Sequence, residues 1–256
     1  MLLWVLRVPR IELPMTRNPS LRAEPCPRQS ISALRWKPVL CGTWLLIGLL
    51  VGGLWAQDAT VRGAVQILHQ SESEMGSGDV VVWLTPISGG AAGPGPTAHL
   101  LQKNKKFIPH VLAVTQGTEI EFPNQDLFFH NVFSIHQGKT IDLGLYESGA
   151  ARKIRFSQPG VSYIFCNIHP QMSAVVLVLR TRLFTVTDTD GSFQINRVPP
   201  GRYKLSVWYE LTPQSESAGL DQEVEVSAGT VEVPKITLHS SDTRPEHLNK
   251  DGQPYY

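Results

Sequence analysis

The sequence predicts an all-β protein with two β-sandwich or barrel domains. After residue 57, no apolar pattern with a helical period extends over a useful length, whereas short runs rich in Val, Ile, Phe and Tyr recur between glycines and prolines. The chain has 256 residues, of which 42% are hydrophobic and 18% are charged. This composition excludes disordered and fibrous classes and allows one large core or two modest ones.

The apolar runs are the expected β-strands. Each combines β-branched or aromatic residues and is bounded by residues that favour turns. In chain order the expected strands cover residues 61–68, 80–84, 107–114, 119–122, 131–134, 153–156, 161–165, 174–179, 184–187, 192–198, 201–209, 221–226 and 231–238. Two domains of roughly 85 to 110 residues fit this pattern.

The linker SGGAAGPGPTA at residues 88–98 follows only two expected strands. Two strands alone are marginally stable in water, so we expect them to pair with strands after residue 182. The stretches VRGAV, DVVVWL and DTDGSFQINRVPPGRY together resemble the carboxypeptidase regulatory-like, or transthyretin-like, β-sandwich. The resemblance implies a discontinuous sandwich at 58–90 and 183–240 with a second β-domain inserted at 97–182.

The segment DTDG at residues 188–191 has two interpretations. Its aspartates suit a calcium loop, but no glutamate follows at the distance that a bidentate ligand needs. Asp-Gly between alternating strands is typical of a hairpin turn, which is the interpretation we favour. The polar tail at 241–256 shows no period and is expected to be loose.

The start of the chain is basic and then apolar. Seven of the 23 Lys and Arg residues lie in the first 56 positions, followed by an uncharged apolar run at 39–56. This pattern is typical of an export signal cleaved after residue 56, or of an uncleaved membrane anchor. We therefore expect an exported, periplasmic protein, anchored to the membrane only if the segment is retained. The rest of the chain is net negative, which argues against nucleic-acid binding.

Cys166 is the only cysteine after the export segment, because Cys26 and Cys41 lie in it or before it. It begins the stretch CNIHPQM, which also holds His169 and Met172. Thiolate and thioether are soft donors and imidazole is borderline, so the three together suit copper rather than magnesium or calcium. A blue-copper centre needs one further histidine, from a separate strand or loop.

The best candidate for that histidine is His130, in the apolar segment FPNQDLFFHNVFS. With this strand, the stretches GTEIEFPNQD and PGVSYIFC and the C-x-x-H-x-x-M spacing, residues 107–179 resemble cupredoxins of the plastocyanin, pseudoazurin and amicyanin kind. The resemblance extends to proteins associated with methylamine utilisation. It implies one type 1 copper, with the ligands His130, Cys166, His169 and Met172.

The resemblance also implies roles around the ligands. The backbone amide of Asn131 corresponds to the family's donor to the cysteine sulfur, and Asn124 would tie the two ligand segments together. His169, with Pro170 beside it, would be the electron port. His110 is a weaker candidate for a further ligand, while His69, His99, His136, His239 and His247 show no clustering and are expected to face solvent.

The expected function is that of a blue-copper electron carrier, not an enzyme, because four protein donors leave no open position for a substrate. Its partners would be redox proteins, such as a dehydrogenase or a cytochrome. Two alternatives stay open: copper delivery or storage through the same residues, and a binding module of the cell envelope in which copper is incidental. A multicopper oxidase is disfavoured because the chain lacks further His-rich pairs.

Overall fold

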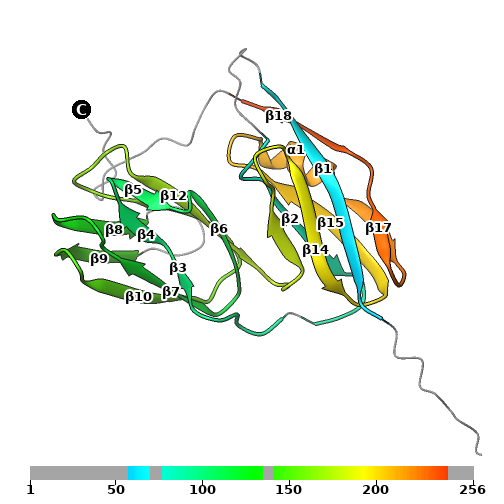
Figure 1. Ribbon diagram of the computed structural model, residues 1–256, viewed down its shortest axis with the longest axis horizontal. Coiled ribbons are helices and arrows are strands. Elements are labelled where there is room, and N and C mark those ends of the chain that lie inside the picture. The colour runs from blue at the N-terminus through cyan, green and yellow to red at the C-terminus, as the bar shows by residue number, and fades with distance from the viewer. Residues whose placement is uncertain (1–56, 70–76, 91, 135–140, 242–256) are drawn as a thin grey trace, which may run out of the picture. The chain divides into compact units, whose positions relative to one another are not determined.

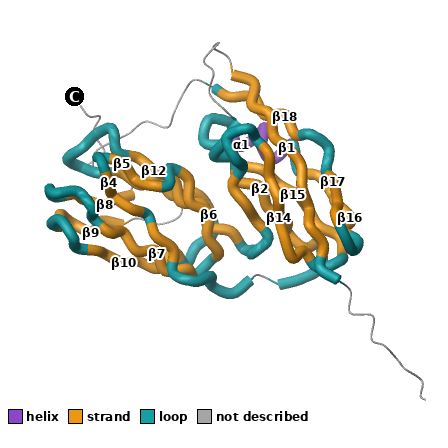
Figure 2. The backbone as a smooth tube through the Cα atoms, viewed as in Figure 1, coloured by secondary structure: helices purple, strands orange, loops and turns teal. Residues whose placement is uncertain are grey.

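The strands of the computed structural model form five β-sheets (Figures 1 and 2). The structure describes residues 57–69, 77–90, 92–134 and 141–241. Within these residues it contains one short helix, α1 (Gln214–Gly219), so the all-β prediction is confirmed. No helix in the described part is long and apolar enough to cross a membrane. The export segment and the tail after residue 241 lie outside the described residues.

Two of the sheets join the beginning and the end of the described chain. One contains β14 (Ser192–Val198), β1 (Ala59–His69), β17 (Thr230–Glu232) and β18 (Ile236–Ser240), and the other contains β13 (Phe184–Val186), β2 (Val81–Pro86), β15 (Gly201–Trp208) and β16 (Gln222–Val226). Both contribute to one buried core with residues such as Val61, Val82, Ile195 and Leu205. We call these eight strands the host sandwich.

The intervening chain forms the other three sheets. A five-stranded sheet has the order β6 (Val111–Thr115), β12 (Ser173–Leu179), β11 (Gly160–Phe165), β8 (His130–Ser134) and β9 (Ile141–Tyr146). A second sheet contains β10 (Ala151–Phe156), β7 (Thr118–Pro123) and β3 (Ala98–His99), and β4 (Leu101–Lys103) pairs with β5 (Lys106–Ile108). They share a core that includes Phe122, Ile164 and Val176. We call these strands the inserted sandwich.

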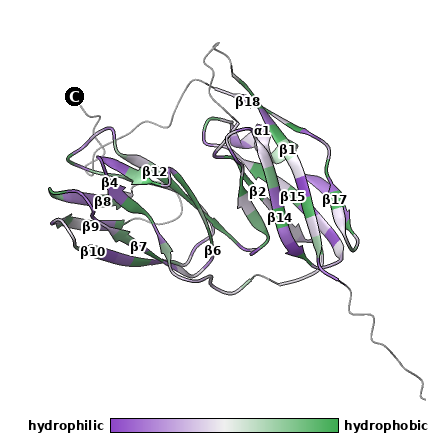
Figure 3. Ribbon diagram, in the orientation of Figure 1, coloured by the Kyte–Doolittle hydropathy of each residue, from purple (hydrophilic) through white to green (hydrophobic). Residues whose placement is uncertain are grey.

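Alternating side chains build both cores. Along β7, for example, Thr118, Ile120 and Phe122 are buried while the residues between them are partly exposed. Figure 3 shows hydrophilic and hydrophobic residues alternating along β14 and β15. This period of two is what a strand with one buried face requires.

Proline accounts for two strands that differ from the prediction. The expected strand at 107–114 is broken into β5 and β6 around Pro109, and the one at 231–238 into β17 and β18 around Pro234. Proline has no backbone N–H to donate to a ladder. The prediction also missed β3, β4, β9 and α1, which are short or largely exposed. Residues 88–98 contain no strand before Ala98 among those described, as expected of a linker.

The DTDG segment forms a tight turn, in which the Gly191 amide donates to the Asp188 carbonyl over 2.9 Å. The flanking strands β13 and β14 belong to different sheets, so the turn links two sheets and the hairpin interpretation was wrong in that respect. Gly191 lies against β1, where the Val65 amide donates to its carbonyl.

The two sandwiches are in contact through a small apolar cluster. Val81 of β2 packs there with Val111, Leu177 and Leu179 of β6 and β12, and Trp83 and Trp208 are partly buried against it. All described residues accordingly belong to one compact unit, Gly53–Tyr256.

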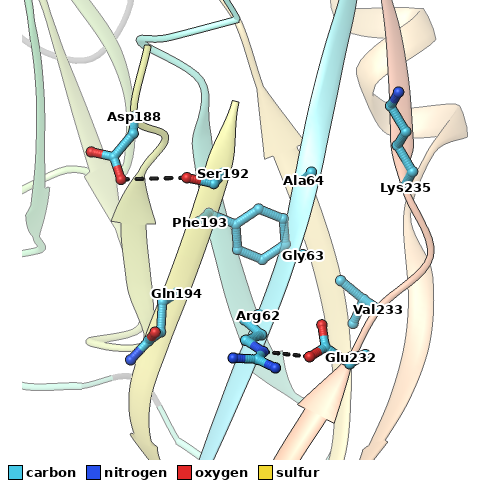
Figure 4. Close-up of a pocket in the computed structure, with 10 residues that line it drawn as sticks. All are labelled: Arg62, Gly63, Ala64, Asp188, Ser192, Phe193, Gln194, Glu232, Val233 and Lys235. Carbon is cyan, nitrogen blue, oxygen red and sulfur yellow. Dashed lines mark hydrogen bonds and ion pairs between the residues drawn. The ribbon is translucent and has the colours of Figure 1, made fainter. Parts of the chain in front are cut away.

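An open hollow of about 430 Å³ lies in the host sandwich beside β1 and β14. Figure 4 shows the residues that line it. Arg62 and Glu232 form an ion pair in it, and Ser192 donates a hydrogen bond to Asp188 at its edge. The hollow contains no histidine or cysteine among its lining residues and takes no part in the site described below.

We expect Gly191→Ala to destabilise the protein by about 3 kcal/mol or more, because it combines backbone strain with a steric clash. Gly191 has a φ of 83°, and a Cβ there would lie 2.0 Å from the Val65 carbonyl oxygen. Gly229 is the matched control, since its φ is 98° but no atom lies within 4 Å of its added Cβ. Gly229→Ala should lower the free energy of unfolding by about 1 kcal/mol, as measured by urea denaturation. Equal decreases for both variants would contradict this account.

Candidate metal centre

Three donor atoms converge at one end of the inserted sandwich. His130 begins β8, Cys166 directly follows β11, and His169 lies in the turn after it. The Nδ1 atoms of the two histidines are 3.1 Å apart, and each lies 3.7 Å from the Cys166 sulfur. The antiparallel pairing of β8 with β11 brings the segments together.

These separations fit one metal ion bound by all three side chains. An ion about 2.0 Å from each nitrogen and about 2.3 Å from sulfur requires donors that are roughly 3 to 4 Å apart at wide angles. Two imidazoles and one thiolate in a trigonal arrangement are the donor set of a blue-copper centre. The residues present therefore fit copper.

Burial shields the donors from water. His130, Cys166 and Met172 are fully buried, whereas His169 is partly exposed. Met172 lies in the same apolar cluster as Cys166. The loop is closed by two backbone hydrogen bonds, from the Met172 amide to the His169 carbonyl over 2.9 Å and from the Cys166 amide to the Met172 carbonyl over 3.2 Å.

A buried carboxylate fixes the ring of His130. Nε2 of His130 donates to Oδ2 of Asp126 over 2.8 Å, and this assigns the proton to Nε2 and leaves Nδ1 free to bind a metal. Carboxylates that receive the second N–H of a metal-bound histidine orient its ring and raise its basicity. Asp126 was not predicted as a site residue, although its position four residues before His130 in a turn was the available signal.

Asp126 is itself held by the hairpin between β4 and β5. Its carboxylate accepts from the backbone amides of Asn104, over 2.6 Å, and Lys105, over 2.9 Å. Burial alone would raise the pKa of Asp126, but the hydrogen bonds from Lys105, His130 and Asn104 lower it below the ordinary value. Asp126 is thus an ionised acceptor at neutral pH.

Two asparagines organise the ligand segments in different ways. The Asn131 side chain accepts from the Asn167 amide over 3.2 Å, so it bridges β8 and the ligand loop. Asn124 accepts from the Asp126 amide and donates to the Phe128 carbonyl, so it shapes the turn ahead of His130. Asn124 was expected to connect the two ligand segments. In the structure, Asn131 makes such a connection.

Apolar side chains lie exposed beside the partly exposed donor. The Phe128 ring lies 5.1 Å from the ring of His130 and 5.4 Å from that of His169, and the Lys105 ammonium lies 5.5 Å from its centroid. Burial, followed by the nearby His130 and Lys105, lowers the pKa of His169, which favours its neutral, metal-binding form. The exposed residues near these rings in the sequence are Leu127, Phe128, Phe129, Ile168 and Pro170.

His110 does not join the donors. Its Nδ1 lies 3.2 Å from the Ser173 carbonyl oxygen and its Nε2 lies 2.7 Å from a Glu210 carboxylate oxygen, so both nitrogens have partners. His99 and His239 are exposed and pair with Glu121 and Glu216, respectively. The side chains of His69, His136 and His247 lie outside the described part of the structure.

The family-model comparison covers part of the host sandwich. Residues 184–232 match the model described as polysaccharide lyase family 4, domain II. This match does not show the carboxypeptidase regulatory-like resemblance that was expected for the host sandwich. No curated protein matches the chain.

Among solved structures, the chain is similar to copper proteins of the cupredoxin kind. A copper-containing nitrite reductase from Thermus scotoductus is 26% identical with a TM-score of 0.32, over 38% of this chain and 26% of that one. A purple cupredoxin from Nitrosopumilus maritimus is 24% identical with a TM-score of 0.29, over 32% and 99% of the two chains. A Cu(I) amicyanin variant is 17% identical with a TM-score of 0.31, over 38% and 98%.

We expect Asp126→Asn to weaken copper binding about 10- to 100-fold without abolishing it, because the uncharged amide holds the His130 ring less firmly. Competition with a chromophoric copper chelator measures the change. Asp190→Asn is the control, because Asp190 lies in an exposed turn of the host sandwich. Unchanged affinity in Asp126→Asn would show that the carboxylate does not support the site.

The contact between His110 and Glu210 predicts a pH-dependent stability. The hydrogen bond that His110 donates to Glu210 raises the pKa of His110 above its ordinary value despite the opposing effect of burial. The Glu210 and Asp79 charges and the hydrogen bond to the Ser173 carbonyl add to the rise. When the pKa of a histidine is higher in the folded protein than in the unfolded protein, protonation stabilises the fold. This stabilisation has its full value below the pKa of the unfolded state, about 6.5, and is lost as pH rises through the pKa of the folded state.

The difference in unfolding free energy between the wild type and Glu210→Gln should therefore be largest near about pH 6 and shrink toward about pH 9. Urea denaturation across this range measures it. A difference that stays constant or grows with pH would contradict the assignment of a charged His110.

Proposed function

We propose that the protein is an exported, one-electron carrier with a single type 1 copper bound by His130, Cys166, His169 and Met172. The observation that carries the proposal is the convergence of two imidazole nitrogens and one thiol within 3.1 to 3.7 Å of one another at a buried site. The soft thioether of Met172 lies in the same core cluster as the thiol.

Bound copper supplies a one-electron couple, Cu(II)/Cu(I). The chain's own residues supply the surroundings that this couple needs. Cys166 provides a soft anionic donor, and Asp126 holds His130 in the metal-binding tautomer. Asn131 and the two loop hydrogen bonds hold the ligand segments together, which would limit rearrangement on the gain or loss of an electron.

The buried donors also favour a carrier over an enzyme. Three of the four proposed ligands are fully buried, and four protein donors leave no position for a substrate. Electrons would enter and leave at the partly exposed His169, beside Pro170. The side chains of Leu127, Phe129 and Ile168 are 93%, 54% and 43% exposed and provide an apolar surface for brief contacts with redox proteins, such as a dehydrogenase or a cytochrome.

Export to the periplasm is part of the proposal. It is supported by the basic and apolar pattern of residues 1–56, which would either be removed or anchor the protein to the membrane. A single thiol would otherwise be exposed to oxidation in such a compartment, and burial at the centre protects Cys166.

The wild-type protein loaded with Cu(II) should show intense visible thiolate-to-copper absorption and a reversible one-electron wave. Cys166→Ser should abolish the absorption, and His130→Ala should weaken or abolish it, since each removes a proposed ligand. His99→Ala is the control, because His99 is an exposed histidine of the same sandwich. A colourless Cu(II) complex, or undiminished colour in Cys166→Ser, would refute the proposal.

Copper delivery is the alternative that uses the same residues. It predicts that Cu(I) transfers readily to a competing chelator, whereas a carrier retains copper through many redox cycles. The pre-formed network around His130 favours retention.

A further inference from the structure

A partly buried polar contact joins the host sandwich to the chain just after the proposed ligand Met172. The ring of His110, which directly precedes β6, lies between the carbonyl of Ser173 and the carboxylate of Glu210. The His110 side chain is 30% exposed and that of Glu210 is 10% exposed. Because the carbonyl and the ionised carboxylate both accept hydrogen bonds, a ring that bonds to both donates from both nitrogens. The contact is therefore an ion pair with an additional hydrogen bond to the backbone.

The hydrogen bond to the Ser173 carbonyl lies directly beside the proposed ligand Met172. Ser173 is the first residue of β12 and the neighbour of Met172. The Met172 carbonyl accepts from the Cys166 amide, and the next carbonyl along the chain accepts from His110. The backbone of His110 also accepts from the Val175 amide over 2.8 Å. The chain after Met172 is thus fixed between the Cys166 segment on one side and His110 on the other.

Glu210 provides the link to the host sandwich. It follows β15 by two residues, and β15 is hydrogen-bonded to both β2 and β16. Val81 of β2, the neighbour of β15, contacts Val111 of β6 and Leu177 of β12 in the inserted sandwich. Glu210 therefore lies in the turn directly after a packed strand of the host sandwich, and its side chain is only 10% exposed.

We propose that Glu210 and His110 are a positioning pair through which the host sandwich sets the placement of Met172 relative to the copper. The inference rests on the proposed copper centre and gives the host sandwich a part in it. The axial methionine of a blue-copper site is a weak, long ligand that tunes the reduction potential. A small displacement of the chain after Met172 therefore changes the spectrum and the potential before it affects the three stronger ligands.

The test compares the full-length, copper-loaded wild type with Glu210→Gln and Glu210→Ala. The measurements are the visible and electron paramagnetic resonance spectra of the Cu(II) form, the reduction potential and the rate of copper loss to a chelator. Both variants should change the relative intensities of the charge-transfer bands and shift the potential, and both should lose copper about tenfold faster. Glu210→Asp, which keeps the charge, should stay nearer to the wild type.

Two controls separate positioning from a general loss of stability. Glu216→Gln removes a carboxylate of the same sandwich that pairs over 2.9 Å with the exposed His239. Ile195→Val loosens the host core without touching the pair. Neither variant should alter the spectra or the potential, and circular dichroism confirms that each variant is folded.

The outcomes are distinct. If the wild type is blue and the Glu210 variants match it in spectrum, potential and copper loss, the positioning role is refuted while the carrier proposal stands. The role is equally refuted if Ile195→Val changes the spectrum as much as Glu210→Gln does. If the wild type shows no thiolate-to-copper band, the carrier proposal fails and the inference fails with it.

Discussion

The hydrogen bond between the His130 imidazole and the Asp126 carboxylate is the contact on which the geometry of the candidate metal centre depends. It decides which nitrogen of a fully buried ring carries the proton, and hence which nitrogen faces Cys166 and His169. A buried carboxylate is costly unless its oxygens are satisfied. Here the amides of Asn104 and Lys105 satisfy them, so a hairpin that contributes no proposed ligand still determines how a ligand is held.

The nesting of the two sandwiches follows from the need of β1 and β2 for partner strands. The strands β1 and β2 could not form a stable unit alone, and they form sheets with β13 to β18 across the whole inserted segment. The resulting host sandwich borders the inserted one at β6 and β12. Since β12 begins directly after Met172, the border lies next to the candidate site, and a contact such as that of His110 with Glu210 arises where the two sandwiches meet.

Most strands were predictable because they bury one face and so alternate in the sequence. The strand expected at 119–122 is an example, in which Ile120 and Phe122 are buried while Glu119 and Glu121 are partly exposed. The strand β9 was missed because its middle is exposed and it includes Gly144, which leaves little apolar alternation to detect. The boundary between β5 and β6 was missed because the apolar residues on both sides of Pro109 form a continuous strand-like pattern in the sequence.

The sequence by itself determined the all-β class and the soft donors of the segment CNIHPQM, because residue chemistry and short spacing are local properties. His130 lies 36 residues before Cys166, so the sequence offered it only as a candidate, from its apolar segment and the resemblance to cupredoxins. Only the tertiary structure decided which polar residues support those donors. Asp126 on His130, Asn131 on Asn167 and Glu210 on His110 are contacts set by sheet pairing and by the packing of two sandwiches. For the last two pairs the sequence separations are 36 and 100 residues, and no local pattern encodes a partner at such a distance.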